Sequence, residues 1–567
     1  YGDDRDLHAF PTRRSSDLAA LLRGVVRPIV LVPKRADHEM SGYVAPGTGD
    51  IGLMLPYTPL HYLLFDRLGE LASQDGSGRS APPLVMTSGN LTSEPLAKDN
   101  DEAVARLGGL CDVFLLHDRR IERRVDDAVV QADYGVGGDG GMVLRRSRGY
   151  VPARVRLNLG RCRPDWSASR REPPVVLAVG AELKSTICLA RMILAGKAGR
   201  VVGAEGESLL SEHIGDLTDA AVYRQFVRTI EHLVGLTEAT VGLIAHDLHP
   251  QYLSTTHALG LARSQGVPLM AVQHHWAHAA SCMAEHGLAG PVIGIVCDGS
   301  GHGPDGAVWG CEILKADLVG YERLGHLQYF PLPGGDAAAR DLYRCAMGVL
   351  WRTFGWESDP VVESLDVGGD PARRRAVLEM LAGGANCPPT SSLGRLFDAV
   401  ASMLGVAAEN TFEGQGPMAL EAIADSRCSD YFPHAIEHHG RRFELDIRPM
   451  VSAMTRRMVH RFEAARLSAM FHNTMVELLK AAALIARKIV CRVTGFPPVP
   501  GKSHGELAAR PRARGPANQR TTQRAEESAT GTTRSFEPFP FTTTNPSARW
   551  SEPIRRVASS ETRTPHA

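Results

Sequence analysis

The sequence predicts an α/β protein made of two consecutive parts, and three observations lead to this prediction. Apolar runs of strand length alternate with longer amphipathic stretches along most of the chain. A basic, proline-bearing linker without apolar periodicity, residues 156–174, separates a shorter unit at 18–155 from a larger one at 175–498. In the larger unit, a strand, a polar turn and a second strand follow one another twice.

The shorter unit mixes strands and helices. Its strand-like runs are residues 28–32, 51–55, 84–87, 113–116 and 142–144. Helices are predicted over 59–73 and 99–108, and Asp99-Asn100 supplies side chains that cap a helix N-terminus. This mixture indicates an α/β domain.

The two strand–turn–strand units define the fold predicted for the larger part. Strands at 175–179 and 187–190 flank the first polar turn, and strands at 292–297 and 307–313 flank a glycine-rich one. Repeated hairpins of this kind predict two similar lobes that face each other across a cleft. Such a two-lobed arrangement is that of the ATPase fold of actin, sugar kinases and Hsp70, where each lobe places one phosphate-binding hairpin at the nucleotide.

The composition narrows the class of protein. The chain has 567 residues and a mass of 61.2 kDa, and 43% of its residues are hydrophobic, so most of it can bury globular cores. Its 63 basic residues balance its 63 acidic ones, so bulk charge indicates neither a nucleic-acid nor a membrane partner. The 10 cysteines form no CxxC motif, which favours a reduced, cytoplasmic protein.

No membrane segment is expected. The most apolar long segment, 475–495, contains Lys480, Arg487 and Lys488, and these charges exclude a membrane span. The N-terminus is charged and lacks the apolar core of a signal peptide.

Both ends differ in character from the chain between them. Residues 1–17 begin with Tyr1, lack apolar periodicity and resemble translated adapter sequence, so a non-native or disordered segment is expected. Between 501 and 567 the chain holds 10 Arg and 17 Ser/Thr but only one Leu, one Ile and one Val. Such a segment cannot bury enough apolar surface to offset its ordering entropy. We expect 499–567 to be a disordered, frameshifted tail that follows an apparent strand start at 494–498; a basic nucleic-acid-binding tail is the alternative.

Three histidines mark a candidate metal site. They follow the apolar run 269–272 and open a helix, on which His274 and His278 lie one turn apart on the same face. Two imidazoles so placed can bind one metal together with a carboxylate. Asp298, at the end of a strand and beside glycines, is the candidate carboxylate. The alternatives are solvated histidines at a polar helix start and an ordinary Asp-Gly turn.

Polar side chains in the turns of the larger unit suit phosphate and nucleotide binding. A lysine beside hydroxyl groups can hold a phosphate, glycines let the backbone approach a ligand, and glutamate can hydrogen-bond a base or ribose. An ordinary surface turn or loop is the alternative for each. The candidates, in chain order, are Lys184, Gly299, Ser300, Gly301, Glu413 and Gly414.

Two further polar clusters, residues 211–217 and 246–250, end apolar runs. We expect them to form the rim of a site. In the alternative interpretation, Asp216 and Asp247 only cap the helices that follow.

The shorter unit also offers nucleotide-binding groups. Thr87, Ser88 and Asn90 lie at a predicted strand end, and Arg124 and Arg148 belong to two arginine-rich segments. Guanidinium forks match the geometry of phosphate and carboxylate groups. An RNA-binding patch is the rival interpretation, and a solvated basic face is the simplest one.

Taken together, motifs between residues 28 and 498 resemble one family, the HypF hydrogenase maturation carbamoyltransferases. The segments that carry the resemblance are LMLPYTPLHYLLF, VMTSGNLTSEPLAKDN, FLLHDRRIERRVDDAV, LRRSRGYVP, AVGAELKSTICLA, HIGDL, AHDLHPQYLST, VQHHWAHAASCMAEHG, DGSGHGPDGAVWG, PLPGGDAAAR, SSLGRLFDAVASMLG and FEGQ.

The resemblance implies a domain order and an activity. Family members combine an acylphosphatase domain, a zinc-finger segment, a YrdC-like domain and a domain similar to the tRNA threonylcarbamoyl-transferases. This chain would hold the C-terminal part of the YrdC-like domain and most of the transferase domain. The implied activity is ATP-dependent carbamoyl transfer from carbamoyl phosphate, through carbamoyl-adenylate, to the C-terminal cysteine of the partner HypE. That product supplies the cyanide ligands of nickel–iron hydrogenase.

The resemblance also implies cofactors and site residues. ATP with Mg²⁺ and one transition metal, zinc or iron, would be bound, with His274, His278 and Asp298 as metal ligands. Lys184 and Asp298 would act in catalysis, and Lys184 and the 299–303 glycines would form the phosphate hairpins. Parts of the YrdC-like pocket would be Thr87, Ser88, Gly89, Asn90, Arg124 and Arg148.

The sequence departs from the family pattern at several points. The acylphosphatase domain, the zinc-finger cysteines and the first half of the YrdC-like domain are not found, and Trp276 stands where the family usually has histidine. After 493–498 the family continues into a Ser-Gly-Gly loop and later a metal-binding Asp, whereas this chain reads PGKSHGELAARP. We therefore expect the polypeptide as written to be inactive. The rival functions are an O-carbamoyltransferase of secondary metabolism and an RNA-binding YrdC-like module.

Overall fold

The computed structural model describes most of the chain before the C-terminal tail. The described ranges are 15–35, 41–74, 81–91, 94–131, 141–159, 175–197, 200–288, 290–365 and 367–494. Residues 1–14, most of the predicted linker (160–174) and the predicted tail 499–567 lie outside them, so the predictions for these segments stay predictions.

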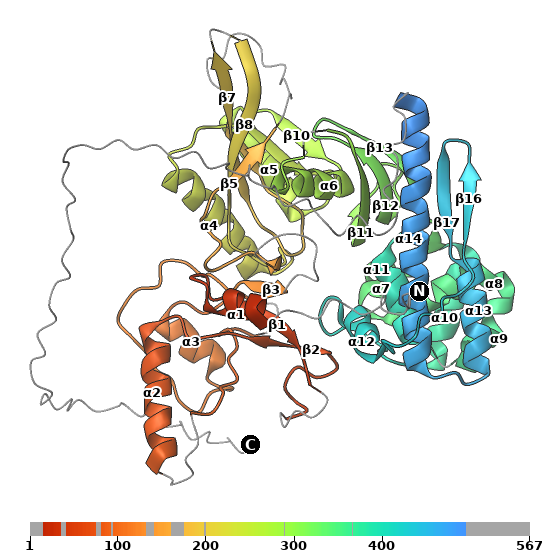
Figure 1. Cartoon of the computed structure of the whole chain (residues 1–567), viewed down its shortest axis with the longest axis horizontal. Helices are drawn as coiled ribbons and strands as arrows, with labels where there is room; N and C mark the ends of the chain where they lie inside the picture. The colour runs from red at the N-terminus through yellow and green to blue at the C-terminus, as the bar shows by residue number, and fades with distance from the viewer. Residues whose placement is uncertain are drawn as a thin grey trace, which may run out of the picture. The chain divides into compact units, whose positions relative to one another are not determined.

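The first part of the chain contains a four-stranded sheet in the order β2-β1-β3-β4 (Figure 1). β1 and β3 run parallel, whereas β2 and β4 pair antiparallel at the two edges. Val30 and Val130, on the two central strands, are fully buried. Asp99 occupies the N-cap position of α3, but its side chain makes no capping hydrogen bond. The elements are α1 (Ser15–Arg23), β1 (Ile29–Pro33), β2 (Asp50–Leu53), α2 (Pro59–Gln74), α3 (Asn100–Leu107), β3 (Val129–Gln131) and β4 (Met142–Arg145).

Three predictions for this part are wrong. The runs 84–87 and 113–116 are not strands, because neither pairs with a strand among the described residues. Their apolar side chains are exposed instead, with 82% of Val85 and 77% of Leu115 accessible. Helix α1 begins at Ser15, so the predicted non-native segment 1–17 extends too far. The remaining predicted strands and both helices are confirmed.

The first lobe of the second part is built on a six-stranded sheet in the order β10-β9-β6-β7-β8-β5. β6, β9 and β10 are parallel, and β7, β8 and β5 continue the sheet antiparallel. Helix α4 begins after Asp219, whose Oδ1 accepts hydrogen bonds from two backbone amides, and it buries Phe226 and Ile230 against the sheet. The elements are β5 (Val155–Asn158), β6 (Val175–Ala178), β7 (Cys188–Lys197), β8 (Arg200–Leu210), α4 (Ala220–Leu236), β9 (Val241–Asp247), α5 (Leu253–Gln265), β10 (Leu269–Val272) and α6 (His274–Glu285).

The predicted boundary at residue 155 is wrong. Residues 156–158, which were predicted to begin the linker, belong to strand β5. β5 pairs antiparallel with β8, so these residues are part of the sheet of the first lobe.

The second lobe contains a sheet in the order β14-β15-β12-β13-β17-β16, to which β11 adds by pairing with β12. Two lobes, each with its own sheet and its own hairpin, confirm the predicted fold class. The strands are β11 (Val292–His302), β12 (Val308–Ala316), β13 (Tyr321–Leu327), β14 (Phe330–Pro331), β15 (Pro389–Thr390), β16 (Ala435–His439) and β17 (Arg442–Asp446). The helices are α7 (Ala337–Arg340), α8 (Leu342–Phe354), η2 (Gly355–Glu357), α9 (Ser358–Leu365), α10 (Pro371–Gly383), α11 (Leu393–Met403), α12 (Gln415–Ile423), α13 (Arg448–Val459) and α14 (Ala464–Thr494).

Two predicted boundaries in this lobe are wrong. Strand β11 does not end before Asp298 but continues to His302, and its register against β12 shifts between Cys297 and Gly301. Asp298 therefore lies in a bulged strand rather than in a turn. Thr494, predicted to start a strand, is the last residue of α14. None of the helices in the described ranges is both long and apolar enough to cross a membrane.

A buried imidazole on β13 belongs to the core of this lobe. His326 is only 8% exposed, and its ring lies 4.7 Å from the ring of Tyr329. Burial, assisted by the charge of Arg323, lowers the pKa of His326 to about 4. The imidazole is therefore neutral at pH 7.

Helix α8 is central to the core of the second lobe, and one glycine permits its position. Helix α8 packs against α11 and α13, which belong to the same group of helices in Figure 1. A Cβ on Gly348 would lie 2.1 Å from the backbone oxygen of Pro331, which no side-chain rotation can relieve. The closeness of helix and strand therefore depends on a glycine at this position.

We predict that Gly348→Ala destabilises the protein by about 1–3 kcal/mol, because α8 must move away from the segment around Pro331. The matched control is Gly260→Ala in the middle of α5, where a Cβ meets nothing within 4 Å. This control should be neutral or stabilising by up to about 1 kcal/mol. Thermal unfolding of the two variants in parallel tests the prediction, and equal midpoints would contradict it.

Candidate functional site

The predicted metal-binding side chains come together in the structure. Helix α6 begins at His274, and the Nε2 atoms of His274 and His278 lie 3.3 Å apart, one helical turn along the same face. Asp298 Oδ2, from β11, is 3.1 Å from His274 Nε2 and 3.8 Å from His278 Nε2. The three ligand atoms all lie within 4.8 Å of one another.

Asp247 holds His274 from the other side. Its Oδ2 is 2.6 Å from His274 Nδ1, and its Oδ1 accepts the backbone amide of His249. A carboxylate only accepts hydrogen bonds, so Nδ1 of His274 carries the proton and Nε2 faces His278 and Asp298. Burial alone would lower the pKa of His274, but the hydrogen bonds and charges of Asp247 and Asp298 raise it to about 9. The position therefore favours positive charge.

The capping roles considered for two aspartates are wrong. The N-cap of α5 is Tyr252, not Asp247. The N-cap of α4 is Asp219, whereas Asp216 Oδ1 accepts the backbone amide of Lys184 at 2.9 Å. Asp216 instead lines a pocket and Asp247 contacts His274, which agrees with the expected place of both clusters at the rim of a site.

The hydrogen bonds of Gln273 distinguish His275 from its two neighbours. Gln273 Oε1 accepts the amide of Trp276 at 2.9 Å, and its Nε2 lies 3.2 Å from both the carbonyl of His302 and Nδ1 of His275. The amide nitrogen donates, so Nδ1 of His275 accepts and the proton sits on Nε2. Burial lowers the pKa of His275 to about 3, which keeps the ring neutral. A protonated Nε2 is no metal ligand, so only His274 and His278 remain.

Glycines in β11 make room for the histidine rings. A Cβ on Gly301 would lie 2.6 Å from Cε1 of His275 and 2.7 Å from Cδ2 of His274. A Cβ on Gly299 would lie 3.3 Å from the guanidinium of Arg395. The glycine-rich segment is thus required for contacts within the protein, and the predicted phosphate role of Gly299, Ser300 and Gly301 stays a prediction.

The three ligands fit a transition metal. Asp298 Oδ2 is buried and lies 3.1 Å from His274 Nε2. Burial raises the pKa of Asp298, but the hydrogen bond and charge of His274 outweigh it and lower the pKa to about 2, so the group is a carboxylate. Two imidazole nitrogens and one carboxylate oxygen form a donor set that suits zinc or iron.

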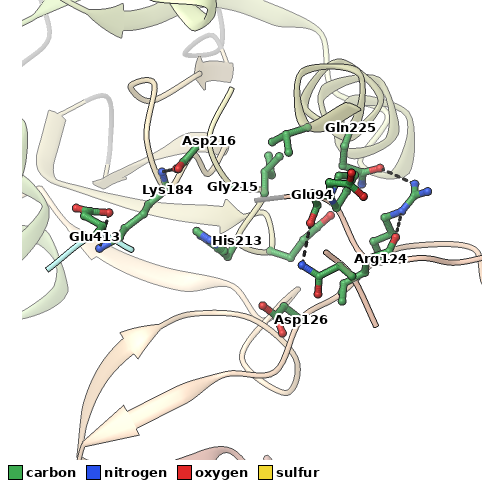
Figure 2. Close-up of a pocket in the computed structure, with 15 residues that line it drawn as sticks. Glu94, Arg124, Asp126, Lys184, His213, Gly215, Asp216, Gln225 and Glu413 are labelled. Atoms are coloured by element: carbon green, nitrogen blue, oxygen red, sulfur yellow. Dashed lines mark hydrogen bonds and ion pairs between the residues drawn. The ribbon is translucent and has the colours of Figure 1, made fainter. Parts of the chain in front are cut away.

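A separate pocket of about 260 Å³ joins residues of both parts of the chain (Figure 2). From the first part, Asn90, Glu94, Arg124 and Asp126 line it, and from the second part His213 and Asp216 do so. Lys184 and Glu413 form its other wall, with Nζ and Oε2 3.0 Å apart. The pocket therefore gathers four of the predicted nucleotide-binding residues, which are Asn90, Arg124, Lys184 and Glu413.

The other predicted residues do not line this pocket. Thr87 and Ser88 are exposed, and Gly414 is the N-cap of α12 with a φ of 81°. Arg148 is held inside the first part: its Nε donates to Asp127 at 2.6 Å, and its guanidinium carbon lies 3.4 Å from the ring centre of Tyr57. These contacts account for Arg148 without a ligand.

The arginine-rich segments are largely paired with other parts of the chain. Arg124 donates to Glu102 at 2.8 Å, and Arg145 pairs with Asp126 at 2.7 Å. Arg123 pairs with Glu212, which is 97% buried as a side chain. Groups held in this way offer little free charge to an RNA backbone, so the paired arginines favour structural roles.

Sequence reasoning did not identify two groups at the metal cluster. The sequence predicts no role for Gln273, and it predicts Asp247 only as a cap or rim residue. The available signal was position: β9 and β10 are parallel with Asp247 directly opposite Val272. Parallel strands end at the same edge of their sheet. Asp247, at the end of β9, therefore lies beside the start of α6, which follows the end of β10.

The comparisons with known proteins agree on one family. Three family models match: the HypF Kae1-like domain at 171–285, the second subdomain of the carbamoyltransferase Kae1-like domain at 294–494, and the model described as "Telomere recombination" (Sua5, YciO and YrdC) at 11–147. The carbamoyltransferase HypF2 of Cupriavidus necator is 40% identical over 495 residues, which cover 82% of this chain and 57% of the relative. A shorter HypF homolog of the same organism is 40% identical and is covered to 75%.

Solved structures give the same result. A crystal structure of full-length HypF in the phosphate- and nucleotide-bound form is similar with a TM-score of 0.70 and 34% identity, covering 84% of this chain and 56% of that one. T. kodakarensis HypF is similar with a TM-score of 0.67 and 31% identity, covering 83% and 57%. The chain thus spans little more than half the length of these relatives.

We predict that His278→Ala weakens zinc or iron(II) binding far more than His275→Gln does. His278 is a proposed ligand, whereas glutamine at 275 keeps a donor near the place of the imidazole Nε2–H and should change the affinity by less than about tenfold. Competition of the purified chain against a chromophoric chelator measures both. Equal losses in the two variants would contradict the assignment of ligands.

We also predict that Asp247→Asn weakens metal binding by about 10–100-fold, because asparagine has one acceptor oxygen where Asp247 uses two, for the amide of His249 and for Nδ1 of His274, and it carries no negative charge. The control is Asp219→Asn, which makes the same chemical change but leaves a good N-cap on α4. The same chelator competition applies, and an unchanged affinity for Asp247→Asn would show that Asp247 does not orient the ligand.

Proposed function

The chain belongs to the HypF family of carbamoyltransferases, and from this membership we propose that its second part transfers a carbamoyl group to a cysteine thiolate of a partner protein, HypE. The observation that carries the proposal is the gathering of His274, His278 and Asp298 where the two family-specific domain models meet. The chain spans little more than half the length of Cupriavidus necator HypF2, so the complete reaction is part of the proposal.

The proposed reaction has three balanced steps. Carbamoyl phosphate and water give carbamate and phosphate. Carbamate attacks the α-phosphorus of ATP, which releases pyrophosphate and leaves carbamoyl-adenylate. The thiolate of HypE then attacks the carbamoyl carbon, the bond to the adenylate oxygen breaks, and AMP leaves with the electron pair. Adenylation therefore converts a poor leaving group into AMP before the transfer.

The chain's own residues would bind and orient the reactants. Lys184 places positive charge where phosphate groups of a nucleotide can lie, and Arg124, on the opposite side of the pocket, would have to exchange its partner Glu102 for a phosphate. Asn90 and Glu413 supply hydrogen-bonding groups beside them. Lys184 pairs with Glu413 at 3.0 Å, so a nucleotide phosphate would compete with that carboxylate for the ammonium group.

The metal cluster would act at the carbamoyl group. His274, His278 and Asp298 would hold the ion, and Asp247 would keep Nε2 of His274 directed toward it. A bound zinc or iron ion supplies Lewis-acid polarisation of a carbonyl oxygen. The cysteine of the partner would be the nucleophile, so the transfer requires no nucleophilic cysteine in this chain.

We predict that a fusion of residues 18–498 of this chain with both the preceding and the following regions of Cupriavidus necator HypF2, which restores the loop and the metal-binding Asp expected after residue 498, carbamoylates the C-terminal cysteine of HypE when given ATP and carbamoyl phosphate. The chain alone should not, because the earlier steps need the preceding region. His274→Ala in the fusion should abolish transfer while leaving ATP consumption with carbamoyl phosphate intact. Mass spectrometry of HypE and release of pyrophosphate measure the two steps separately.

Two outcomes would overturn the proposal. Transfer by the His274→Ala fusion at the unsubstituted rate would remove the metal cluster from the reaction. Carbamoylation of a small-molecule hydroxyl instead of HypE would favour the O-carbamoyltransferase alternative.

A further inference from the structure

A second group of metal-ligating side chains lies on the sheet of the second lobe, away from the histidines of α6. Strands β13, β17 and β16 are neighbours at one edge of that sheet. His326 pairs in register with Glu444, and Glu444 pairs with Glu437. These three residues form one row across three strands, so their side chains share a face of the sheet.

The row places two carboxylates directly opposite each other. Like charges at directly paired positions destabilise an antiparallel pair. His439, two residues after Glu437, projects from the same face, and its Nε2 lies 3.9 Å from Glu437 Oε2. The ligand atoms of Glu437, His439 and Glu444 all lie within 4.8 Å of one another.

His326 is the independent observation that points to a cation. Its Nδ1 lies 2.9 Å from the carbonyl oxygen of Leu327, so Nδ1 donates and Nε2 of the neutral ring carries the lone pair. That lone pair faces Glu444 Oε1 at 3.7 Å, and Nε2 makes no hydrogen bond to any described residue. Two acceptors that face each other in this way repel unless a proton or a cation lies near both.

Arg448 orients the carboxylate of Glu437 but makes no hydrogen bond to Glu437 Oε2, the oxygen on the side of His439. Its guanidinium lies 2.5 Å from Glu437 Oε1 and also binds Asp446, which leaves Glu437 Oε2 on the side of His439. A carboxylate ligand oriented by a second hydrogen-bonding group is typical of metal sites in proteins. One arginine offsets one of the two glutamate charges, so Glu444 still lacks a cationic partner within the described chain apart from the histidines.

We propose that Glu437, His439 and Glu444, together with His326, bind a divalent transition metal of the zinc type. Two imidazoles and two carboxylates are a donor set that zinc accepts in four-coordinate sites. The ion would join strands that come from distant parts of the sequence and would stabilise the edge of the sheet. The proposal is independent of the proposed carbamoyl transfer, because it uses none of the residues assigned to it.

The test uses the full chain carrying His274→Ala and His278→Ala, so that the first cluster does not contribute. After removal of metal with a chelator, titration with zinc should show one equivalent bound, and Co²⁺ should give the visible absorption of a tetrahedral site. Adding Glu444→Gln or His439→Ala should weaken binding by about tenfold or more. Zinc should also raise the unfolding temperature of the parent but not of these variants.

The matched control is His438→Ala. His438 lies between two of the proposed ligands, but its side chain alternates to the opposite face of β16, so its loss should leave zinc binding unchanged. Circular dichroism checks that each variant is folded, and Glu444→Gln keeps the size of the side chain. Equal zinc affinity in Glu444→Gln and His438→Ala, or no bound equivalent in the parent, would overturn the proposal.

Discussion

The hydrogen bond between Asp247 and His274 is the interaction on which the candidate centre depends. Helical spacing alone puts His274 and His278 on one face, but it does not decide which ring nitrogen of His274 faces the other ligands. The 2.6 Å contact with Asp247 decides this, and it joins the end of β9 to the first residue of α6. The parallel pairing of β9 with β10 puts both ends at the same edge of the sheet, so the geometry of the site follows from strand order.

The second lobe supplies the third ligand, Asp298, because the backbone of β11 lies close to the histidine side chains of α6. Gly301 lets the rings of His274 and His275 lie against β11, and the bulge before it turns Asp298 toward them. Ser392, the N-cap of α11, donates to the carbonyl of Gly299 at 2.7 Å and fixes the bulge from behind. The ligand set therefore depends on packing that only a residue without Cβ permits.

Local patterns in the sequence predicted what depends on local spacing. The pair His274 and His278 needed only the helical repeat, and the hairpins needed only the alternation of apolar runs and polar turns. The role of Asp247 was missed because its partner is 27 residues away along the chain and meets it only through a parallel strand. The apolar runs at 84–87 and 113–116 show the opposite error, since β propensity forms no strand where no neighbouring strand pairs with it.

The group on β13, β16 and β17 could not be found from the sequence for the same physical reason. Glu437 and His439 are close in sequence, but Glu444 meets them only through the register of the β16–β17 hairpin. His326 meets Glu444 only because β13 pairs directly with β17, although several helices separate the two strands in the sequence. A shift of one residue in either pairing would move the histidine or the glutamate to the other face. A metal bound there would therefore favour this register over its neighbours, so the ligands that the register brings together would in turn help to fix it.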